Sequence, residues 1–594
     1  MEYQQLSPQH LLQAIISGCE NLKQARKKLN EINFFPVADG DTGDNMAATA
    51  TAIIENASVQ STMHETLESV ANASILGARG NSGMLFSSFF NGLYQAYSKT
   101  HSLTTNQFSV MLQKAAGQVR QSLIDPMEGT LLTVVDSWAK LIQAKSKEYT
   151  NFKTLCHDIL HPLHEALHQH CEYTHHNQEK VLDAGALGFY HFVEGFAKGL
   201  GEQQTYQPMQ TESIEDFSIP NQDHQFSTAP PHNRYCTEAL LRDARISPLQ
   251  LQQHLQGFGD SIVVTGHQHL QRFHIHTNAP QKIFESLLTI GRVANPKVDD
   301  MQRQFDCHIC KPNRIALLTD SSADLPVQIM DQHQIHLLPI NIHIGHHHLL
   351  DPYSIDPAQF YQNIKKNPDY PTTSAPNPLQ IKNKFRELTQ RHQDVIMVAV
   401  AEKLSSTYAT ATHIAKEFKG IRVVNSKLTS AAQSLLVYQA AELIANPMLD
   451  TEAIIQELQG ASSKIVFFVL IHKLDALMRS GRVDKLSGTF ANWARVKPIL
   501  RLNDEGRGHM YSKALTFNKG FQQLLNAIDE EAVLRQSKLK HFAIVHAGQA
   551  EQAANLAQAA TDHYQQDALY IGPVSAAIGL HAGAGCIGIA AMFA

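Results

Sequence analysis

The hydrophobic pattern changes along this chain, and that change limits the folds open to it more than any other feature. Up to about residue 200, segments such as HLLQAIISGCENLKQARKKL and LHEALHQHCEYTHH place apolar residues three and four positions apart, as amphipathic helices do. A polar stretch at 202–232, rich in Gln, Ser, Thr and Pro, is typical of a linker. Beyond it, short apolar runs alternate with helical patterns. A chain of 594 residues is too long for one hydrophobic core, so we expect several domains.

The segments after the linker predict two regions that mix strands and helices. Between 233 and 310, DSIVVTG and RFHIHTN are strand-like and SPLQLQQHLQGF is helix-like. From Arg314 onward, several apolar runs end in small polar residues: IALLTDSS, DVIMVAVA, IRVVNS, KIVFFVLI and HFAIVHAG. This pattern predicts a parallel sheet with helices on both faces. Because ligands of such sheets bind at the carboxyl ends of the strands, the polar residues after each run are candidate site residues.

Composition argues against several classes of function. The formal net charge is −6 and there is no long Lys/Arg block, so no nucleic-acid partner is expected. The seven cysteines, an odd number, favour a reducing cytoplasm over a disulfide framework. The N-terminal residues lack the basic and apolar stretches of a signal peptide. We therefore expect a cytoplasmic protein.

Two local features have ordinary structural interpretations. Residues 568–594 contain no Asp, Glu, Lys or Arg, as a membrane span would, but Pro573, His581 and several glycines favour buried strands joined by tight turns. The triplet His346, His347 and His348 lies inside the chain and has no ligand-like spacing around it, so we expect a solvated loop there.

The segment NFFPVADGDTGDNM, residues 33–46, gathers three acidic side chains. Asp39, Asp41 and Asp44 lie within six positions and are interleaved with glycines. Carboxylates this close repel one another unless a cation lies between them, and Mg²⁺ prefers carboxylate and phosphate oxygens. An Asx-rich turn is the alternative. A calcium loop of the EF-hand type would need a Glu at its twelfth position, and none stands there.

This acidic segment resembles the DhaL-like nucleotide-binding domain of dihydroxyacetone kinases and of the ATP subunit of bacterial fatty-acid kinases. Three further segments match in the same order: GARGNSG (77–83), PMEGTLLTVV (126–135) and VLDAGALG (181–188). The resemblance implies a helical barrel that binds ATP and two Mg²⁺ ions at one end. Asp44 stands where the family more often has Thr, and Ala186 stands where Gly is usual.

The resemblance also assigns residues. Asp39 and Asp41 would be catalytic metal ligands, with Asp44 as a further candidate ligand. The residues expected to contact nucleotide, phosphate or metal are Asn33, Thr42, Gly43, Asn45, Asn81, Ser82, Gly83, Gly129, Thr130 and Asp183. Capping of loops and helices is the alternative role for Ser82 and Thr130.

A second metal site is predicted in the middle region. His274 and His276 are two apart on a strand-like segment, so both imidazoles lie on one face. With Cys236 they form a Cys-His-His set suited to zinc, with a fourth position open. On spacing alone, two solvated or core histidines are an equally plain interpretation. The segments YCTEALL, GDSIVV, FHIHTNAP and KVDDMQRQ resemble the middle domain of the fatty-acid kinase ATP subunit, which implies zinc. Cys307 and Cys310 form a CxxC that could compete as ligands, but no second CxxC accompanies it.

Five segments from Leu318 to Gly585 resemble the DegV family, whose members hold one fatty acid between two α/β lobes. They are LTDSSADLP, PTTSAPNP, LSSTYATA, RSGRVDKLSG and GLHAGAG, with Ser406 and Ala584 as departures from the usual Gly and Pro. The residues that would bind the acid are Ser321, Thr373, Ser374, Ser405, Arg482 and His581. A guanidinium can hold a carboxylate in fork geometry. The alternatives are serines that form turns, an Arg482 in a surface ion pair, and a His581 that packs.

Together these resemblances imply a multidomain, fused fatty-acid kinase. We expect a DhaL-like all-α barrel at 1–201, a linker at 202–232, a small α/β domain at 233–312 and a two-lobed α/β DegV fold at 313–594. The chain would transfer the γ-phosphoryl group of ATP to a fatty-acid carboxylate for phospholipid synthesis, with Asp39, Asp41, Arg482 and His581 as catalytic residues. A homodimer and a downstream acyl-phosphate acceptor enzyme are expected partners, and transient contact with a membrane surface is left open. The alternatives are a non-catalytic lipid-binding regulator and a kinase for a small polyol or ketone.

Overall fold

The computed structural model describes residues 4–33, 40–97, 103–169, 172–173, 180–200, 230–309, 313–364, 370–482 and 496–594. These residues divide into two compact units, Met1–Met301 and Gln302–Ala594. The predicted helical and middle domains therefore both fall in the first unit. Among the described residues, no helix combines the length and the apolar character that crossing a membrane requires.

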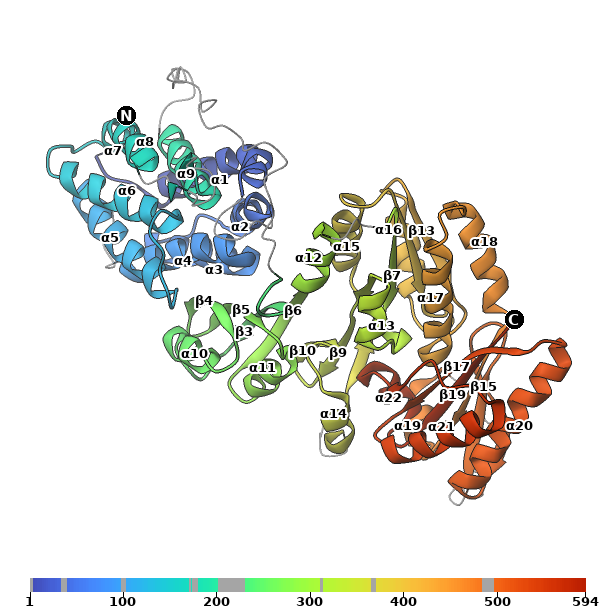
Figure 1. Ribbon diagram of the computed structural model, residues 1–594. Coiled ribbons are helices and arrows are strands. Elements are labelled where there is room, and N and C mark those ends of the chain that lie inside the picture. Colours follow the sequence, from blue (N-terminus) through green and yellow to red (C-terminus); the bar gives the residue numbers. More distant parts are fainter. Residues whose placement is uncertain are drawn as a thin grey trace. The chain divides into compact units, whose positions relative to one another are not determined.

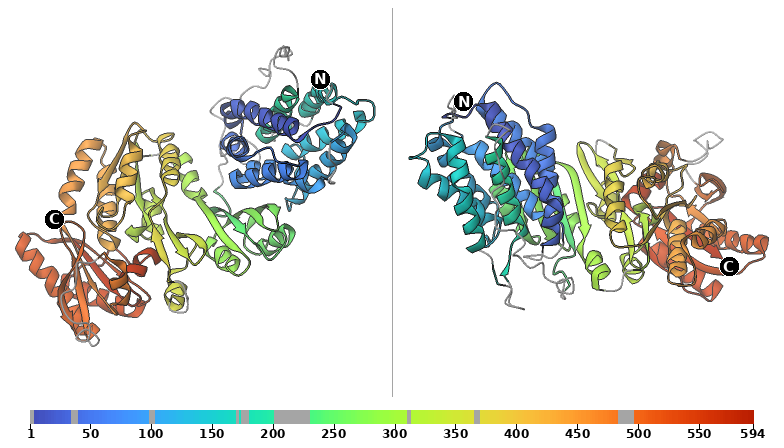
Figure 2. Two further views of the ribbon diagram at one scale, coloured as in Figure 1. Left: turned by 180° about the vertical axis from the view of Figure 1, so that it is seen from behind. Right: turned by 90° about the horizontal axis from the view of Figure 1, so that it is seen from above.

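The first unit begins with an all-helical barrel (Figure 1). Around it, α1 packs against α2, α2 against α4, α4 against α5, α5 against α6, α6 against α9, and α9 returns to α1. Figure 2 shows these helices side by side. The bounds are α1 Pro8–Glu31, α2 Thr42–Asn56, α3 Met63–Gly77, α4 Gly80–Ala96, α5 Thr105–Gln121, α6 Leu131–Lys145, α7 Phe152–Asp158, α8 Leu160–Gln169 and α9 Ala184–Gly199, with a short pair β1 Glu172–Tyr173 and β2 Lys180–Val181. The predicted helical first domain is confirmed.

Aromatic side chains fill the barrel. Phe89 lies edge-on to Phe189, with ring centroids 5.1 Å apart, and Phe86 lies edge-on to Phe192 at 5.2 Å. Trp138 contacts Phe89 at 5.7 Å, and all five rings are buried. Such pairs contribute about 0.5–1.5 kcal/mol each beyond the burial of apolar area. The core therefore draws on α4, α6 and α9, helices far apart in the sequence.

A four-stranded antiparallel sheet follows in the same unit. Its order is β4-β5-β3-β6, with all neighbours antiparallel. The Asn91 side-chain amide of α4 donates to the Gly266 carbonyl oxygen at 2.7 Å, and His267 lies 2.9 Å from Asn72 of α3, so the sheet packs on α3 and α4. The bounds are β3 Tyr235–Arg242, α10 Pro248–Leu255, β4 Asp260–His267, β5 Leu270–Thr277, α11 Pro280–Leu287 and β6 Arg292–Asp300. The predicted small α/β region is confirmed.

The second unit has two lobes, and the first carries the predicted parallel sheet. Its order is β13-β12-β7-β8, with all neighbours parallel. Phe385 of α15 and Ile414 of α16 pack on one face with Leu318 and Met397, and α17 contacts β7 and β12. The bounds are α12 Met301–Ile309, β7 Ile315–Asp320, η2 Ser321–Ala323, α13 Val327–Gln332, β8 Ile335–Leu338, α14 Pro357–Asn363, α15 Pro378–Thr389, β12 Asp394–Ala399, α16 Thr407–Ala415, β13 Ile421–Asn425, α17 Ser430–Ile444 and α18 Thr451–Ser462.

A small antiparallel sheet, β10-β9-β11, accompanies the first lobe and corrects the expectation for the histidine triplet. The strands are β9 Ile340–Ile344, β10 His347–Asp351 and β11 Thr372–Ser374. Only His346 lies in the exposed turn. His347 and His348 are half-buried on β10, and His348 lies 3.0 Å from the Asn341 side chain. A two-residue turn between strands leaves no room for the solvated loop we predicted.

The second lobe contradicts the prediction of a parallel sheet. Its six strands run β16-β15-β14-β19-β17-β18, and every pair is antiparallel except β17–β18. Every residue of β19 is buried and α17 contacts it, so a central antiparallel strand has the same unbroken apolar pattern as a parallel one. The bounds are β14 Ile465–Leu470, α19 Asp475–Ser480, β15 Lys497–Leu502, β16 Gly508–Ala514, α20 Phe517–Arg535, β17 Leu539–His546, α21 Ala550–Tyr564, β18 Ile571–Pro573, α22 Ala576–Ala582 and β19 Ile587–Phe593.

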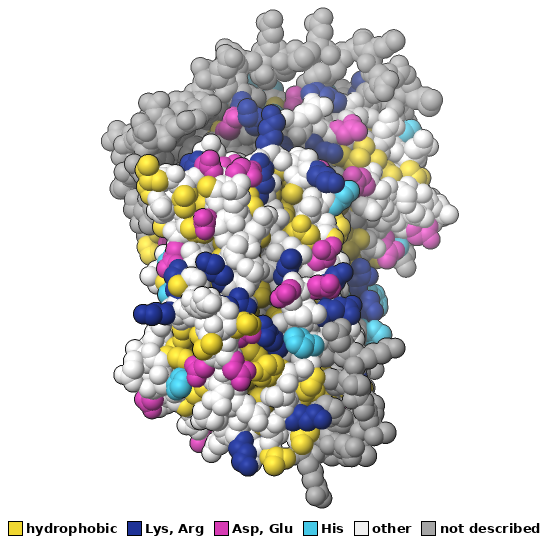
Figure 3. Space-filling view, turned by 90° about the vertical axis from the view of Figure 1, so that its right-hand side faces the viewer, with side chains coloured by type: hydrophobic (Ala, Val, Ile, Leu, Met, Phe, Trp, Pro, Cys, Tyr) yellow, Lys and Arg dark blue, Asp and Glu magenta, His cyan; other side chains and the backbone are white. Residues whose placement is uncertain are grey.

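The charge-free C-terminal run consists of buried strands around a short helix, as predicted. β18, α22 and β19 all lie within it, and β19 is a central strand of the second lobe's sheet. On the face of the molecule shown in Figure 3, basic and acidic side chains are intermixed with hydrophobic ones over the described residues.

The barrel generates a first prediction, at the closest approach of α1 and α2. A Cβ atom at Gly43 would overlap the Arg26 carbonyl oxygen, so Gly43→Ala forces the two helices apart. Overpacking of this kind should lower the free energy of unfolding by about 1–3 kcal/mol. Gly117→Ala is the matched control, because nothing lies within 4 Å of a Cβ on that helical glycine. Thermal unfolding should rank the Gly43 variant clearly below the Gly117 variant, and equal midpoints would contradict the packing described.

Candidate functional site

Four helices of the barrel begin at one end of it. Thr42 starts α2, and its hydroxyl oxygen lies 3.2 Å from that of Ser82 in the first turn of α4. At the start of α9, a Cβ on Gly185 would lie 3.4 Å from the Cβ of Leu131, the first residue of α6. Gly188 of α9 packs against Met46 of α2. Free N–H groups and the positive ends of helix dipoles favour phosphate groups, so this end of the barrel is a candidate phosphate site.

Of the three predicted carboxylates, the structure places one at this end. Asp41 directly precedes α2, and the side-chain amide of Asn45 donates to its carboxylate at 2.7 Å. Asp39 lies outside the described residues. Asp44 departs from the prediction, because its carboxylate pairs with the guanidinium of Arg26 on α1. With a cationic partner already in place, Asp44 is not positioned as a magnesium ligand.

Other predicted nucleotide residues surround the same helix ends. The Asn81 side-chain oxygen is buried and has no hydrogen-bond partner among the described residues, so it offers an acceptor to a ligand. Asn33 is buried at the end of α1. Asp183 instead caps α9 by accepting the N–H of Ala186 at 2.6 Å. The methyl group of Ala186, the departure from Gly, is buried in that first turn.

The capping alternative for the hydroxyls is not what the structure has. Ser82 bonds to Thr42, and the Thr130 hydroxyl donates to the Met127 carbonyl oxygen at 2.9 Å. Gly129, before α6, has a φ of +82° that favours glycine, and its N–H donates to Thr133 at 2.8 Å. At Gly83, a Cβ would lie 2.8 Å from the Asn45 carbonyl oxygen, so this glycine allows α4 to approach α2 closely. The sequence prediction named it for ligand contact.

The predicted zinc residues come together on the middle sheet. Cys236 of β3 is paired in register with His276 of β5, and the ligand atoms of Cys236, His274 and His276 all lie within 4.8 Å of one another. The two Nε2 atoms of the histidines are 3.2 Å apart, and the Cys236 sulfur is 3.6 Å from His274 Nδ1. Two nitrogens bound to one tetrahedral zinc would be about 3.3 Å apart. The arrangement fits a zinc ion.

Sequence reasoning missed Glu238, which lies beside this cluster. Its carboxylate is fully buried and accepts from Arg272 at 3.1 Å, and it lies 3.2 Å from His274 Nδ1. A carboxylate in this position fixes the orientation and tautomer of a ligand histidine. Burial would raise the pKa of Glu238, but Lys297, His274 and Arg272 lower it well below its ordinary value. The available signal was its position two residues after Cys236, on the same strand face.

Glu238 also connects the cluster with the candidate phosphate site. The N–H of Gly80, the first residue of α4, donates to Glu238 Oε1 at 2.7 Å. Burial, Glu238 and, more weakly, the charge of Asp41 raise the pKa of the Cys236 thiol, so Asp41 lies within electrostatic reach of the cluster. The metal cluster and the helix ends are therefore neighbours within the first unit.

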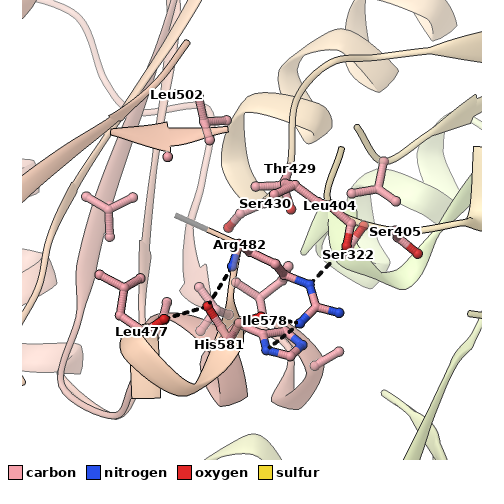
Figure 4. Close-up of a pocket in the computed structure, with 18 of the residues that line it drawn as sticks. Ser322, Leu404, Ser405, Thr429, Ser430, Leu477, Arg482, Leu502, Ile578 and His581 are labelled. Atoms are coloured by element: carbon pink, nitrogen blue, oxygen red, sulfur yellow. Dashed lines mark hydrogen bonds between the residues drawn. The ribbon is translucent and has the colours of Figure 1, made fainter. Parts of the chain in front are cut away.

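The second unit contains a cavity of about 440 Å³. Most of its lining is apolar, including Phe467, Val469, Leu500 and Val545. Hydroxyl groups, Arg482 and His581 also line it (Figure 4). A long apolar space with a few polar groups is the usual form of a site for an amphipathic small molecule.

Arg482 and His581 form a defined hydrogen-bond chain. Burial and the neighbouring guanidinium lower the pKa of His581 to about 4, so the ring is neutral at pH 7. Since Arg482 can only donate, His581 Nδ1 accepts from its Nη1 at 3.2 Å. The proton is then on Nε2, which donates to the Thr373 hydroxyl at 2.8 Å. The Thr373 hydroxyl hydrogen is left for a ligand.

Carbonyl oxygens hold the rest of the guanidinium. Arg482 Nε donates to Leu404 O at 2.9 Å, and Nη1 also donates to Ser480 O at 3.2 Å (Figure 4). Within the described residues Nη2 makes no hydrogen bond, so it remains available to an anion. This geometry differs from the surface ion pair that was the alternative for Arg482.

The structure sorts the predicted substrate residues. The cavity is lined by Thr373, Ser374, Ser405, Arg482 and His581. Ser321 is not among the lining residues. Its hydroxyl donates to Asp351 and accepts the N–H of Ile340, both within 3.1 Å, so it holds β9 against η2. Its neighbour Ser322 lines the cavity instead, as do Thr429 and Ser430, which the sequence prediction missed.

Two carboxylates of the first lobe hold the helix that carries His581. Asp324 accepts the N–H of Ser575 at 2.7 Å, and Asp351 accepts the N–H of Ala576 at 3.1 Å, at the start of α22. Negative groups are favourable at a helix N-terminus. Burial, with the nearby Asp324, raises the pKa of Asp351 to about 7. These contacts position α22 between the lobes.

Three family models match the chain one after another. They are a DAK2 domain at 36–198, a FakA-like middle domain of fatty acid kinase at 232–307 and an uncharacterised protein of the DegV family at 314–594. The chain is therefore a multidomain protein of a kinase-type family joined to a DegV module. Its domain order is that of a fused fatty-acid kinase.

Individual relatives cover parts of the chain. Protein DegV of Bacillus subtilis is 28% identical over 277 residues, 46% of this chain and 98% of that protein. An uncharacterized protein of Staphylococcus epidermidis is 28% identical over 306 residues, 49% of this chain and 54% of that protein. The chain thus spans about half the length of that curated relative. A fatty-acid-binding DegV family protein from Thermus thermophilus matches at 25% identity and a TM-score of 0.45, covering 47% of this chain and all of that one.

The Glu238 geometry predicts an effect on metal affinity. Glu238→Gln keeps the size of the side chain but removes the charge beside His274 and Arg272. Loss of such a carboxylate should weaken zinc binding about 10–100-fold, measured by competition with a chelating dye. Glu285→Gln, on the exposed side of α11, is the control and should leave the affinity unchanged. Equal affinities in the two variants would remove Glu238 from the site.

Proposed function

We propose that this protein transfers the γ-phosphoryl group of ATP to the carboxylate of a fatty acid that its DegV module binds. A carboxylate oxygen forms a bond to the γ-phosphorus, the bond from that phosphorus to the β,γ-bridging oxygen breaks, and ADP leaves with the electron pair. The products are an acyl phosphate and ADP. An acceptor enzyme would then consume the acyl phosphate for phospholipid synthesis. A homodimer remains part of the proposal.

The helix ends of the barrel support the ATP half of this proposal. Asp41, Thr42, Asn45, Asn81 and Ser82 offer a carboxylate, hydroxyls and amides around helix N-termini that favour phosphate groups. Asp39, outside the described residues, remains a predicted ligand. Magnesium, when bound, would neutralise phosphate charge, which together with positioning supplies most of the catalysis in phosphoryl transfer.

The cavity of the second unit supports the fatty-acid half, and it is the observation that carries the proposal. Its apolar lining suits an acyl chain, while Arg482 Nη2 and the Thr373 hydroxyl are donors for a carboxylate. DegV family proteins from Thermus thermophilus and Bacillus subtilis are described as fatty-acid-binding. A carboxylic acid with a pKa of about 4–5 is ionised at pH 7 and needs no general base to act as nucleophile. The neutral His581 is therefore assigned to positioning the donors.

Exchange of Asp41 tests the kinase site against a neighbour of the same charge. Asp41→Asn should lower ATP-dependent acyl-phosphate formation by roughly 100-fold or more, because a buried electrostatic contact to the reacting phosphate is lost. Asp44→Asn breaks a partly exposed ion pair with Arg26 and should cost less than about fivefold. Formation of acyl phosphate can be followed by trapping with hydroxylamine. Equal activity in both variants would contradict this assignment, and no activity in wild type would favour a lipid-binding regulator.

Exchange of Arg482 tests the fatty-acid site. Arg482→Gln removes a charged donor from a buried site and should weaken binding of a long-chain fatty acid by roughly 10–100-fold. Arg422→Gln is the control, because Arg422 forms an exposed ion pair with Glu452. Binding can be measured by displacement of a fluorescent fatty acid, together with mass spectrometry of lipid that co-purifies. Unchanged affinity in the Arg482 variant would remove the head group from this end of the cavity.

A further inference from the structure

A second cluster of metal-binding side chains lies in the second unit. Cys307 of α12, His336 of β8 and His392, which follows α15, bring their ligand atoms within 4.8 Å of one another. All three residues are buried, with exposed fractions of 4%, 4% and 7%. They are far apart in the sequence, so the fold alone brings them together. The cluster is separate from Cys236, His274 and His276, and neither the proposed kinase site nor the fatty-acid cavity uses it.

The hydrogen bonds of the cluster leave donor atoms without partners. His336 Nδ1 and His392 Nε2 are buried and have no hydrogen-bond partner among the described residues. A buried polar atom without a partner costs about 1–3 kcal/mol, so a ligand that uses these nitrogens would recover that cost. His392 Nδ1 lies 2.8 Å from the Asn313 carbonyl oxygen, to which it donates. This fixes the tautomer in which Nε2 carries a lone pair, the form that binds a metal.

The distances and charges suit a metal ion of intermediate softness. The Cys307 sulfur is 3.9 Å from His336 Nε2, close to the roughly 3.6 Å between a sulfur and a nitrogen on one tetrahedral zinc. Three cations lie nearby. Arg303 is paired with Asp331, and Lys384 with Glu387, while Arg391 is the third. Burial lowers the pKa values of both histidines, so both rings are neutral, as metal ligands must be.

We propose that Cys307, His336 and His392 bind a structural zinc ion. Thiolate and imidazole donors select zinc over magnesium and calcium, which prefer oxygen. The ion would fix α12 to the parallel sheet of the first lobe, where the guanidinium of Arg303 already contacts the Met330 carbonyl oxygen. Cys307 is the last residue of the match to the middle-domain model, whereas both histidines lie in the match to the DegV family. The site therefore needs both segments in one polypeptide.

Metal content of the full chain tests the proposal. After loading with zinc and dialysis, wild type should retain about two zinc ions per chain if both clusters are filled, and Cys307→Ser with His392→Gln should retain about one fewer. Cys236→Ser with His276→Gln reports the other cluster separately. Cys156→Ser, which removes a buried thiol of the barrel that belongs to neither cluster, should leave the content unchanged. Wild-type zinc content in the Cys307/His392 variant would overturn the proposal, whatever the Cys236 cluster binds.

Cobalt substitution provides a readout that a merely misfolded variant would not imitate. In the Cys236/His276 variant, Co²⁺ should still produce a thiolate-to-cobalt charge-transfer band, and adding Cys307→Ser should abolish it. Adding Cys156→Ser instead should leave the band in place. Far-ultraviolet circular dichroism checks that each variant is folded, and the conservative His336→Gln serves if the Cys307 variant is not. Absence of the band from the folded Cys236/His276 variant would also overturn the proposal.

Discussion

The first unit depends on one buried carboxylate, that of Glu238. A charge removed from water is tolerated only when partners surround it, and removing a single partner of a buried pair costs about 3–5 kcal/mol. The partners here come from three places: the backbone at Gly80, the side chain of Arg272 and the ring of His274. The start of α4 and the metal cluster must therefore stay together, since separating them would leave the carboxylate buried and unpaired.

The same constraint organises the second unit. Asp324 and Asp351 are held among hydroxyls and the first N–H groups of α22, so the helix that carries His581 is tied to the first lobe. Gln433 of α17 contacts Thr319 of the first lobe, and Ser434 contacts Tyr570 of the second. The cavity thus has its polar end built from both lobes while its walls are apolar strands. Cys307, His336 and His392 repeat the principle at α12, where buried nitrogens lack partners.

The sequence predicted the type of most elements because periodicity reports how a segment is buried. It failed where two arrangements share one pattern. A central antiparallel strand such as β19 is as apolar as a parallel one, so the mixed sheet of the second lobe was not foreseen. Motif resemblance likewise named Ser321 for the fatty acid and Asp44 for magnesium. Their partners, Asp351 and Arg26, lie 30 and 18 positions away, and no local pattern indicates such pairs.

By itself the sequence determined the domain order, the helical barrel, the strand that aligns His274 with His276, and the set of residues around the cavity. These follow from spacing along the chain, which the backbone geometry of a helix or strand converts directly into faces. Only the tertiary structure decided which carboxylate faces the helix ends, that Glu238 joins metal cluster and phosphate site, and that Cys307 meets two distant histidines. Contacts of this kind depend on how whole elements pack, and packing is fixed by the burial of side chains contributed from the entire chain.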